Sequence, residues 1–330
     1  MTLRLLTLAD VQQSISMEQA IDAMESAFKQ LARQEAKLPL RTAISIEQEQ
    51  AMTLTMPAYL IQEKILGLKV VSIFPNNLSR HKPSINGFIM LLDAQTGEPK
   101  VLMDAGYLTA LRTGAVSGLA TRCFAKDDAH QVAIIGAGQQ ALTQLQAVAA
   151  VRDIKQVSVW SRNQANAEQF AKQCAHMFDV SVHPSVASAV KNADVICTAT
   201  SSTEPLIHPQ DIAPDIHINA IGSHTSTMRE ISNAVLEKAI VIADQREAVL
   251  AEAGEIISAI HQHHLTKESI IELGHWLLHK KDNYKKRLTV FKSVGLAIQD
   301  LSVAEVVYQN AQANNLGMPF ALSRAEAAIL

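Results

Sequence analysis

Apolar and polar residues follow two different patterns along the chain, and the first pattern mixes helix and strand periods. Met17, Ala20, Ile21, Met24 and Phe28 recur about every 3.6 residues, which predicts an amphipathic helix. Runs of strand-forming residues follow at 51–60, 65–75 and 85–105, and the last of them folds back as a hairpin at residues 95–98. Residues 108–124 then predict another helix. The first third of the chain is therefore expected to be an α+β region.

From Gln131 onward, short apolar runs alternate with helical segments. Strands are predicted at 131–138, 157–161, 180–184, 194–200, 217–222 and 239–244, with helices between them at 139–151, 166–177 and 187–193. This alternation predicts an α/β fold with a doubly wound parallel sheet. Beyond residue 250 the chain is expected to be helical, and residues 289–312 are expected to form one long closing helix.

Composition narrows the class of protein. The 330 residues are 48% apolar and 18% charged with a net charge of -3, so the basic excess of a nucleic-acid-binding protein is missing. No apolar run approaches the ~20 residues that a membrane span needs, and Arg4 and Asp10 interrupt any leader-like segment. Cys123, Cys174 and Cys197 are few and widely spaced, which is typical of reduced thiols. We expect a soluble cytoplasmic protein without nucleic-acid or membrane partners.

The stretch GAGQQA, residues 136–141, fits the dinucleotide-binding pattern G-x-G-x-x-A. It follows an apolar strand and opens a helix, which is the context that this pattern requires. Gly136 permits the tight turn and Gly138 lets the backbone approach a pyrophosphate, which the helix amides then face. An ordinary strand–helix turn is the alternative, but the alternating strands favour a Rossmann NAD(P)-binding domain over residues 119–305. Residues 1–118, with about 306–330 returning to them, are expected to form a second α/β domain for substrate binding and dimerisation.

The end of the second predicted strand favours NADPH. An NAD enzyme usually carries an acidic residue there, which binds the ribose 2′-hydroxyl. This chain has Ser161, Arg162 and Asn163 instead, and a hydroxyl, a guanidinium and an amide suit a 2′-phosphate. A solvent-exposed surface arginine is the competing interpretation of Arg162, and NADH stays open as the cofactor.

Three basic residues in the first domain suggest a carboxylate ligand. Lys69 lies in a strand that is apolar on both faces, and Arg112 falls at the inward edge of an apolar helical stripe. Arg41 lies in a shorter, mixed stretch. Cations in an apolar setting indicate a small carboxylate, which arginine binds through two hydrogen bonds. Internal salt bridges to Asp93 or Asp104 are the alternative.

Several of these stretches together resemble the ornithine cyclodeaminase/mu-crystallin family, closest to its ketimine reductase branch. They are LPLRT, GLKVVSIFPNN, GFIMLLDAQTGEP, LTALRTGAVSGLATR, VAIIGAGQQA, NAIGSHTSTMREI and TVFKSVGLAIQD. The resemblance implies a homodimer whose active site lies between a Rossmann domain and a second α/β domain. It also implies that Arg41, Lys69 and Arg112 hold the substrate carboxylate and that Ser84 lines the pocket. The cofactor contacts that it implies, beyond Gly136 and the strand end at Ser161, Arg162 and Asn163, are Ala137, Gly138, Gln139, Gln140, Thr198, Ala199, Thr200, Ile221, Lys292 and Ser293.

One position departs from the cyclodeaminase pattern. Where those enzymes carry a catalytic aspartate after N-A-V-G-G, this chain has His224. Oxidising an amine needs a base to remove a proton, whereas reducing a preformed cyclic imine needs only hydride donation and an orienting group. The resemblance therefore favours an NADPH-preferring reductase of Δ1-pyrroline-2-carboxylate, which gives L-proline. Δ1-Piperideine-2-carboxylate, which gives L-pipecolate, is a further candidate, and Lys69, Arg112 and His224 are the expected catalytic residues.

Other interpretations stay open. A neutral imidazole at His224 can act as a base near neutral pH, so ornithine cyclodeaminase, which releases ammonia and proline from ornithine, is an alternative. An alanine-dehydrogenase-like amino-acid oxidoreductase and a mu-crystallin-like ligand-binding protein are two others. His224 is equally interpreted as a hydrogen-bonded loop histidine. The cluster of His261, His263 and His264 lacks acidic or cysteine ligands at a recognised spacing, so no metal site is expected.

Overall fold

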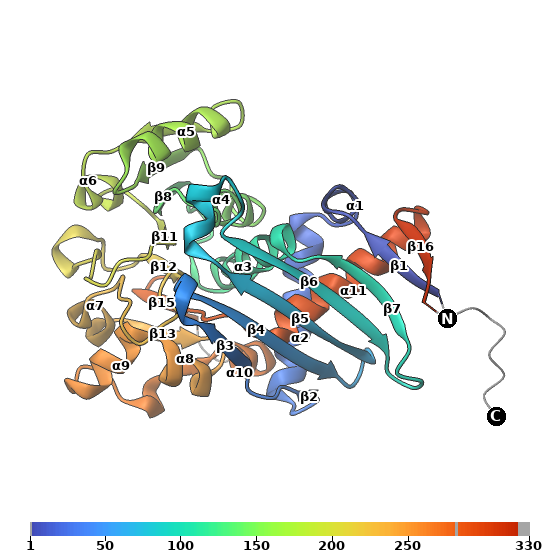
Figure 1. Ribbon diagram of the computed structural model, residues 1–330. Helices are drawn as coiled ribbons and strands as arrows, with labels where there is room; N and C mark the ends of the chain where they lie inside the picture. Colours follow the sequence, from blue (N-terminus) through green and yellow to red (C-terminus); the bar gives the residue numbers. More distant parts are fainter. Residues whose placement is uncertain (1, 281–282, 323–330) are drawn as a thin grey trace, which may run out of the picture. The chain divides into compact units, whose positions relative to one another are not determined.

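The computed structural model describes residues 2–280 and 283–322, and its chain divides into two units inside a long helix (Figure 1). This helix, α3, spans Gly106–Phe124, and the division falls between Arg112 and Thr113. Unit 1 comprises the described residues up to Arg112 together with those from Leu296 on, and unit 2 comprises Thr113–Gly295. The domain limits expected at 118 and 305 lie within helices near these two divisions, and they stay a proposal.

Unit 1 is built on a mixed sheet with the strand order β16-β1-β7-β6-β5-β4-β2, and β3 pairs with β4. β1 and β7 are parallel, and the other pairs are antiparallel. Its elements are β1 (Thr2–Leu6), α1 (Leu8–Gln13), α2 (Met17–Ala32), β2 (Ala36–Lys37), β3 (Thr42–Ile46), η1 (Glu47–Glu49), β4 (Ala51–Leu60), β5 (Ile65–Ile73), η2 (Pro75–Arg80), β6 (Ile85–Asp93), β7 (Pro99–Asp104), the first part of α3, α11 (Ala297–Ala313) and β16 (Met318–Ala321).

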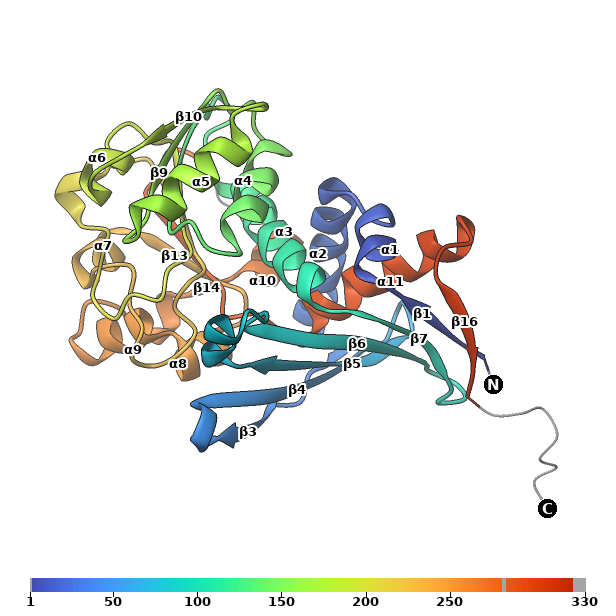
Figure 2. The same ribbon diagram turned by 45° about the horizontal axis from the view of Figure 1, so that its top comes forward.

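Local sequence signals account for the packing of α2 and of β5. Ser16 and Gln19 form a reciprocal cap at the start of α2, and the predicted apolar face of this helix is buried. In β5, alternate residues face α11, which packs on β4, β5 and β6 (Figure 2). A Cβ at Gly67 would lie 2.4 Å from the Met90 carbonyl oxygen of β6, so the close approach of β5 and β6 at this point requires glycine.

Unit 2 carries the parallel sheet that the alternating pattern predicted. Its strand order is β10-β9-β8-β11-β12-β15-β13-β14, and every pair is parallel. The elements are β8 (Gln131–Ile135), α4 (Ala141–Ala149), β9 (Gln156–Trp160), α5 (Gln164–Cys174), β10 (Asp179–Val182), α6 (Val186–Val190), β11 (Val195–Thr198), η3 (Pro209–Asp211), β12 (His217–Ala220), α7 (Asn233–Lys238), β13 (Ile240–Ala243), α8 (Arg246–Glu252), α9 (Gly254–His261), η4 (Lys267–Ser269), β14 (Ile271–Glu272), α10 (Leu273–His279) and β15 (Thr289–Lys292).

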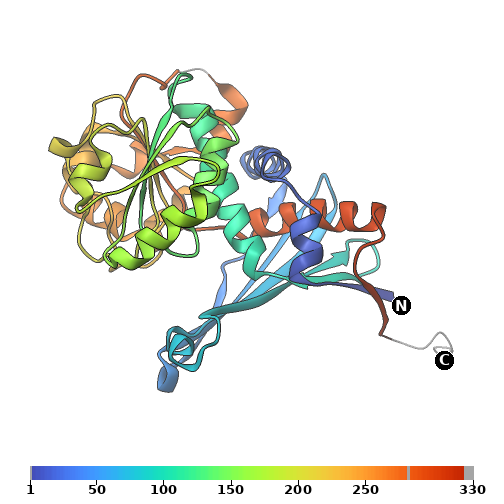
Figure 3. The same cartoon turned by 90° about the horizontal axis from the view of Figure 1, so that it is seen from above.

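Helices cover both faces of this sheet (Figure 3). Val132 and Ile134 of β8 belong to the apolar cluster that includes α4 and α5. Ala133 and Ile135 belong to the cluster on the other face, with residues of α6, α7 and α9. Because neighbouring residues of a strand point to opposite faces, a strand between two helix layers must be apolar throughout. The predicted α/β doubly wound fold is confirmed.

The closing helix predicted over residues 289–312 is wrong in its first part. Thr289–Lys292 form β15, which lies between β12 and β13 in the sheet, and α11 begins only at Ala297. All four residues of β15 are buried, so they behave as a central strand. Gly295 has φ +86°, a conformation that ends the strand segment before the helix and that other residues rarely adopt. Periodicity alone cannot separate a short buried strand from a helix segment.

The carboxyl end of α3 is held by one arginine of unit 2. The Arg152 guanidinium is buried and donates to the carbonyl oxygens of Thr121 at 3.0 Å, Ala125 at 2.8 Å and Lys126 at 2.6 Å. It also donates to the Val151 carbonyl at 2.7 Å. The Thr121 carbonyl also accepts from the Ala125 amide at 3.0 Å, and the Lys126 carbonyl from the Ala129 amide at 3.3 Å. The guanidinium therefore adds a charged donor to carbonyls at and just after the end of α3, and its charge is favourable at the negative end of the helix dipole.

Cys123, Cys174 and Cys197 all carry free thiols. Among the helices of the described residues, none has the length and hydropathy that a membrane crossing requires.

Candidate active site

A pocket of about 250 Å³ lies in unit 2 where β8, β9 and β11 end. Ligands of open α/β sheets bind at this carboxyl edge. Gly136 has φ +103°, and a Cβ there would lie 2.6 Å from the Ala199 carbonyl oxygen, so the turn requires glycine. A Cβ at Gly138 would meet nothing within 4 Å, so packing does not explain this glycine. Close approach of a ligand does explain it.

Most of the predicted cofactor residues line this pocket. They are Gly136, Ala137, Gly138, Ser161, Arg162, Asn163, Ala199 and Thr200. The lining residues that sequence reasoning missed are Trp160, Asn166, Ser201, Ser202 and Leu206, and all but Leu206 lie within a few positions of a predicted residue. None of the described lining residues is acidic. Backbone amides, hydroxyls and a guanidinium in an acid-free lining fit the phosphates of a dinucleotide.

Six predicted cofactor residues lie outside this lining: Gln139, Gln140, Thr198, Ile221, Lys292 and Ser293. Gln139 and Gln140 are not among the lining residues, and Gln140 directly precedes α4. Thr198 is fully buried, and its hydroxyl donates to Glu230 Oε2 at 2.8 Å. The Thr198 side chain therefore binds Glu230 and does not line the pocket.

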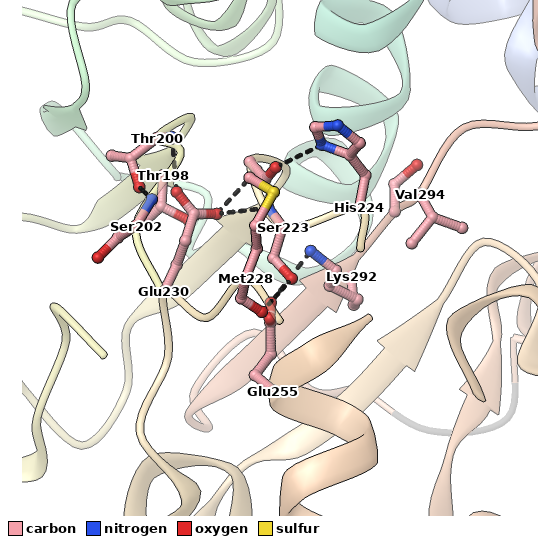
Figure 4. Close-up of polar contacts among 12 residues, drawn as sticks. Thr198, Thr200, Ser202, Ser223, His224, Met228, Glu230, Glu255, Lys292 and Val294 are labelled. Atoms are coloured by element: carbon pink, nitrogen blue, oxygen red, sulfur yellow. Dashed lines mark hydrogen bonds and ion pairs between the residues drawn. The ribbon is translucent and has the colours of Figure 1, made fainter. Parts of the chain in front are cut away.

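The buried carboxylate of Glu230 holds the loops next to the pocket in place, and the sequence did not predict this role. Its carboxylate accepts hydrogen bonds from the Thr200 amide at 2.6 Å and from the Gly222 amide at 2.7 Å, besides the Thr198 hydroxyl (Figure 4). One buried side chain thus joins the loops that follow β11 and β12. Burial raises the pKa of Glu230, while the charge of Lys292 and the Thr200 hydrogen bonds lower it. Thr200 lies 30 residues and Gly222 eight residues from Glu230, and neither separation belongs to a recognised motif, so the sequence does not mark this residue.

Ser223 and His224 play different parts in the loop after β12. Ser223 is fully buried, and its hydroxyl donates to the Met228 carbonyl oxygen at 2.8 Å, which closes the loop (Figure 4). His224 is exposed, and its Nδ1 lies 2.8 Å from the Gly222 carbonyl oxygen. A carbonyl only accepts, so Nδ1 carries the proton and Nε2 is the acceptor of the neutral ring. The hydrogen bond orients the imidazole, and its catalytic role stays a prediction.

The side chains of Lys292 and Ser293 point into the interior of unit 2. Lys292 Nζ lies 3.0 Å from Glu255 Oε1, and both residues are buried (Figure 4). The Ser293 hydroxyl donates to Asp244 Oδ2 at 2.7 Å, and the same oxygen accepts from the Val294 amide at 2.9 Å. Any contact that Lys292 or Ser293 makes with a nicotinamide must therefore come from the backbone. Ile221 is also buried, at the end of β12.

Lys69 and Arg112, two of the three residues predicted to bind a carboxylate, share one buried carboxylate of the protein itself. Lys69 Nζ lies 2.8 Å from Asp300 Oδ2, and Arg112 Nε lies 3.0 Å from Asp300 Oδ1. Arg112 Nη1 also donates to Gln299 Oε1 at 2.8 Å. We call Lys69, Arg112 and Asp300 the buried ion group. It contains two cations and one carboxylate, so one positive charge is in excess within the group.

The alternative interpretation, internal salt bridges, is confirmed for Lys69 and Arg112, but Asp93 and Asp104 are wrong as their partners. Asp93 Oδ1 accepts from the Gln95 and Thr96 amides at 2.9 and 2.8 Å in the hairpin turn. Asp104 Oδ1 accepts from the Gly106 amide at 2.9 Å. Both carboxylates satisfy backbone donors in turns, which is the usual local role of aspartate.

The charges around Lys69 also involve Arg41. Burial lowers the pKa of Lys69 to about 8, the negative charge of Asp300 opposes this, and the charges of Arg112 and Arg41 add to it. The charges of Arg112 and Arg41 therefore both reach Lys69. Arg41 is half-buried just before β3. Ser84 is half-buried just before β6, and its carbonyl accepts from the Phe74 amide at 2.7 Å.

The arrangement corresponds to a known protein family. The family model described as "Ornithine cyclodeaminase/mu-crystallin family" matches residues 2–315. The protein belongs to this family.

Relatives within the family share both units. A Δ1-pyrroline-2-carboxylate reductase of Bacillus cereus is 36% identical over 310 residues, which cover 92% of this chain and 95% of the relative. The structure of Thermococcus litoralis Δ1-pyrroline-2-carboxylate reductase in complex with NADH and L-proline is similar, with TM-score 0.92 and 36% identity over 96% of this chain and 99% of the other. An archaeal alanine dehydrogenase dimer with bound NAD has TM-score 0.91 and 32% identity over 98% of this chain and all of the other.

Two histidines outside this site pair with acids. His264 Nδ1 lies 2.8 Å from Glu237, and His275 Nδ1 lies 3.2 Å from Glu272. Over residues 2–280 and 283–322, no group of three or more histidine, cysteine, aspartate or glutamate side chains is placed to hold a metal ion.

Proposed function

We propose that this protein reduces cyclic 2-imino acids and converts Δ1-pyrroline-2-carboxylate to L-proline. The observation that carries the proposal is the buried ion group, in which Lys69 and Arg112 share the single carboxylate of Asp300. A buried excess cation is costly unless an anion compensates it. A substrate carboxylate supplies that anion, and the acid-free dinucleotide pocket supplies a place for the cofactor. The family and its reductase relatives support the same reaction.

In this proposal the residues of the chain bind and orient the substrate. A bound nicotinamide supplies the hydride that reduces C2 of the imine. Arg112 and Arg41 hold the carboxylate, which fixes the face of the ring that is attacked. Lys69 contributes to carboxylate binding and, as an ammonium, donates to the imine nitrogen the proton that accompanies the hydride. His224, oriented by its hydrogen bond to the Gly222 carbonyl oxygen, exchanges protons at the edge of the site.

Alanine dehydrogenase is the second candidate function, because a dehydrogenase of this kind shares the fold at 32% identity. Both reactions pass hydride to a carbon–nitrogen double bond beside a carboxylate. They differ in whether the imine is cyclic and preformed or arises from a keto acid and ammonia. Ornithine cyclodeaminase is less favoured, since His224 stands where that reaction uses a carboxylate base.

The absorbance of the reduced nicotinamide tests these candidates directly. The purified protein is given Δ1-pyrroline-2-carboxylate with NADPH or NADH, and parallel reactions contain Δ1-piperideine-2-carboxylate or pyruvate with ammonia. Rapid oxidation with the five-membered imine is expected. Oxidation only with pyruvate and ammonia would replace the proposal by the dehydrogenase. No oxidation with any substrate, together with release of ammonia from ornithine, would favour the cyclodeaminase.

We also propose that the cofactor is NADPH, which Arg162 distinguishes from NADH. Arg162 is exposed and lines the pocket beside Ser161 and Asn163. The Arg162→Ala variant is expected to raise KM for NADPH by roughly tenfold, because a charge-assisted hydrogen bond contributes about 1.5–3 kcal/mol and an exposed one lies at the low end. KM for NADH should stay nearly unchanged. Steady-state kinetics with both cofactors measures this.

The matched control for this variant is Arg33→Ala, which removes an exposed arginine from the end of α2, outside the pocket. It should leave both constants unaltered. An equal rise of KM for NADPH and for NADH in Arg162→Ala would contradict recognition of the 2′-phosphate.

We propose that the working form is a cytoplasmic homodimer. The face of β5 opposite α11 carries Leu66, Leu68 and Val70, which pair with Leu92, Met90 and Phe88 of β6. Phe88 is 38% exposed and the others are half-buried. An apolar sheet face of this kind is typical of an interface, and the similar alanine dehydrogenase is a dimer. Light scattering at several concentrations tests the assembly, and a monomer throughout would reject it.

A further inference from the structure

Asp300 belongs to the buried ion group, but the proposed reaction gives it no role of its own. It lies in the first turn of α11 and is completely buried, like Lys69, which it meets on the α11 face of β5. Lys69 and Asp300 are far apart in the sequence, so only the packing of α11 on the sheet brings them together.

Each oxygen of Asp300 binds a different cation. Oδ2 lies 2.8 Å from Lys69 Nζ, and Oδ1 lies 3.0 Å from Arg112 Nε. The neighbouring Gln299 binds a second nitrogen of the same guanidinium at 2.8 Å. One carboxylate therefore fixes the distance between the two cations, and two consecutive residues of α11 fix the plane of the Arg112 side chain. Asp300 cannot shift without moving both groups.

The charge of Asp300 matters as much as its geometry. The charges of Asp300, Arg112 and Arg41 act on Lys69, and of these three only that of Asp300 is negative. Without that charge, the buried ammonium would keep the repulsion of the two guanidinium groups and lose the attraction that offsets it. The neutral amine would then be favoured over the ammonium.

We propose that Asp300 is a positioning residue that keeps Lys69 protonated and holds Arg112 in the orientation that binds the substrate carboxylate. This inference rests on the proposed function, because it assigns Asp300 to the site of that reaction. Asp300 itself does not bind the substrate, since both of its oxygens are bound to the cations. It neutralises one of the two cations and leaves one positive charge in the group, which matches a monocarboxylate.

The sign of the pH dependence follows from the charges. Burial lowers the pKa of Lys69 to about 8 while Asp300 opposes that change, so removal of the Asp300 charge lowers the pKa further. A step that needs the ammonium is lost as pH rises through this pKa. The alkaline limb of kcat/KM, which reports groups of the free enzyme, should therefore lie near pH 8 in the wild type. In Asp300→Asn it should move to lower pH.

Asp300→Asn is expected to lower kcat/KM at neutral pH by roughly thirtyfold or more, as loss of one partner of a buried charge pair does. Part of the loss should be regained as pH falls, because Lys69 is protonated again. Glu305→Gln, one turn later on α11, is the matched control and should keep the wild-type profile. A uniform loss at all pH values, with an unmoved alkaline limb, would overturn the role in protonation.

A second measurement is independent of activity. Carbon NMR of protein labelled at lysine Cε follows the titration of Lys69, which is assigned by the resonance that Lys69→Met lacks. The resonance should titrate at lower pH in Asp300→Asn than in the wild type. If it does so and no imine is reduced, the proposed function fails while the pairing stands. If imines are reduced and the titration does not move, the role of Asp300 fails.

Asp300→Glu keeps the test decisive if the asparagine variant does not fold. It retains the charge but displaces the oxygens, so the alkaline limb should stay in place while KM for the imino acid rises. If the alkaline limb of kcat/KM moves in Asp300→Glu, the negative charge at this position is not what keeps Lys69 protonated.

Discussion

Lys69→Met is expected to lower kcat/KM for the imino acid by about 10²–10⁴-fold, the range that a positioned proton-handling group contributes. Lys69 is buried in the middle of β5 and supplies one of the two cations bound by Asp300. Methionine has a similar length and no charge, so the variant removes the ammonium without opening a large cavity. Arg112 still pairs with Asp300, so the acid does not become an unpaired buried charge.

Steady-state kinetics with Δ1-pyrroline-2-carboxylate and the preferred cofactor measures the effect, and a thermal melt shows that the variant is folded. The matched control is Lys37→Met on β2, where the side chain is exposed and distant in sequence from the ion group. Its kinetics should be those of the wild type. Binding of the cofactor to Lys69→Met should also be normal, because the dinucleotide pocket consists of unit 2 residues. A loss smaller than threefold would remove Lys69 from the mechanism.

Arg152→Ala is expected to give the largest loss of stability. The buried guanidinium donates to carbonyl oxygens at the end of α3 and to that of Val151. Alanine leaves these acceptors without the donor, and a buried group that loses a charged hydrogen-bond partner costs about 1–3 kcal/mol. With several acceptors affected, we expect the free energy of unfolding to fall by about 3 kcal/mol. The melting temperature should fall by roughly 6–12 °C, at about 2–4 °C for each kcal/mol.

Differential scanning calorimetry measures this change. Lys155→Ala is the control, because it removes an exposed cation paired with Asp153 from the same segment, and such pairs contribute about 0–1 kcal/mol. Arg152→Lys should not restore stability, since an ammonium lacks the planar fork that reaches several carbonyls. A melting temperature for Arg152→Ala within about 2 °C of the wild type would contradict the cap.

Structural features that depend only on residues close together in the chain could be predicted from the sequence. The helix at α2 and the alternation of strands and helices in unit 2 follow from local periodicity. The turn at Gly136 and Gly138 was found because its chemistry depends on a fixed spacing, and the residues predicted around it line the pocket. Trp160 and Ser202, which were not predicted, line the pocket because they lie at or just after the carboxyl ends of β9 and β11.

Features that depend on distant parts of the chain could not be predicted in this way. The helix prediction fails at β15 because its four residues carry no period of their own, and only insertion between β12 and β13 makes them a strand. The salt-bridge alternative names Asp93 and Asp104, which are nearer in sequence to Lys69 and Arg112, but their partner in the structure is Asp300.

The fold class, the dinucleotide turn and the basic residues of the site could be predicted from the residues alone, because periodicity, glycine spacing and charge in an apolar run are local properties. The acids that hold these groups could be identified only from the packing of the folded chain. Asp300 reaches Lys69 through the packing of α11 on β5, and Glu230 reaches Thr200 and Gly222 through the meeting of two strand ends. A buried charge must find a partner, but its free energy depends on distance in space, and the order of residues along the chain does not record that distance.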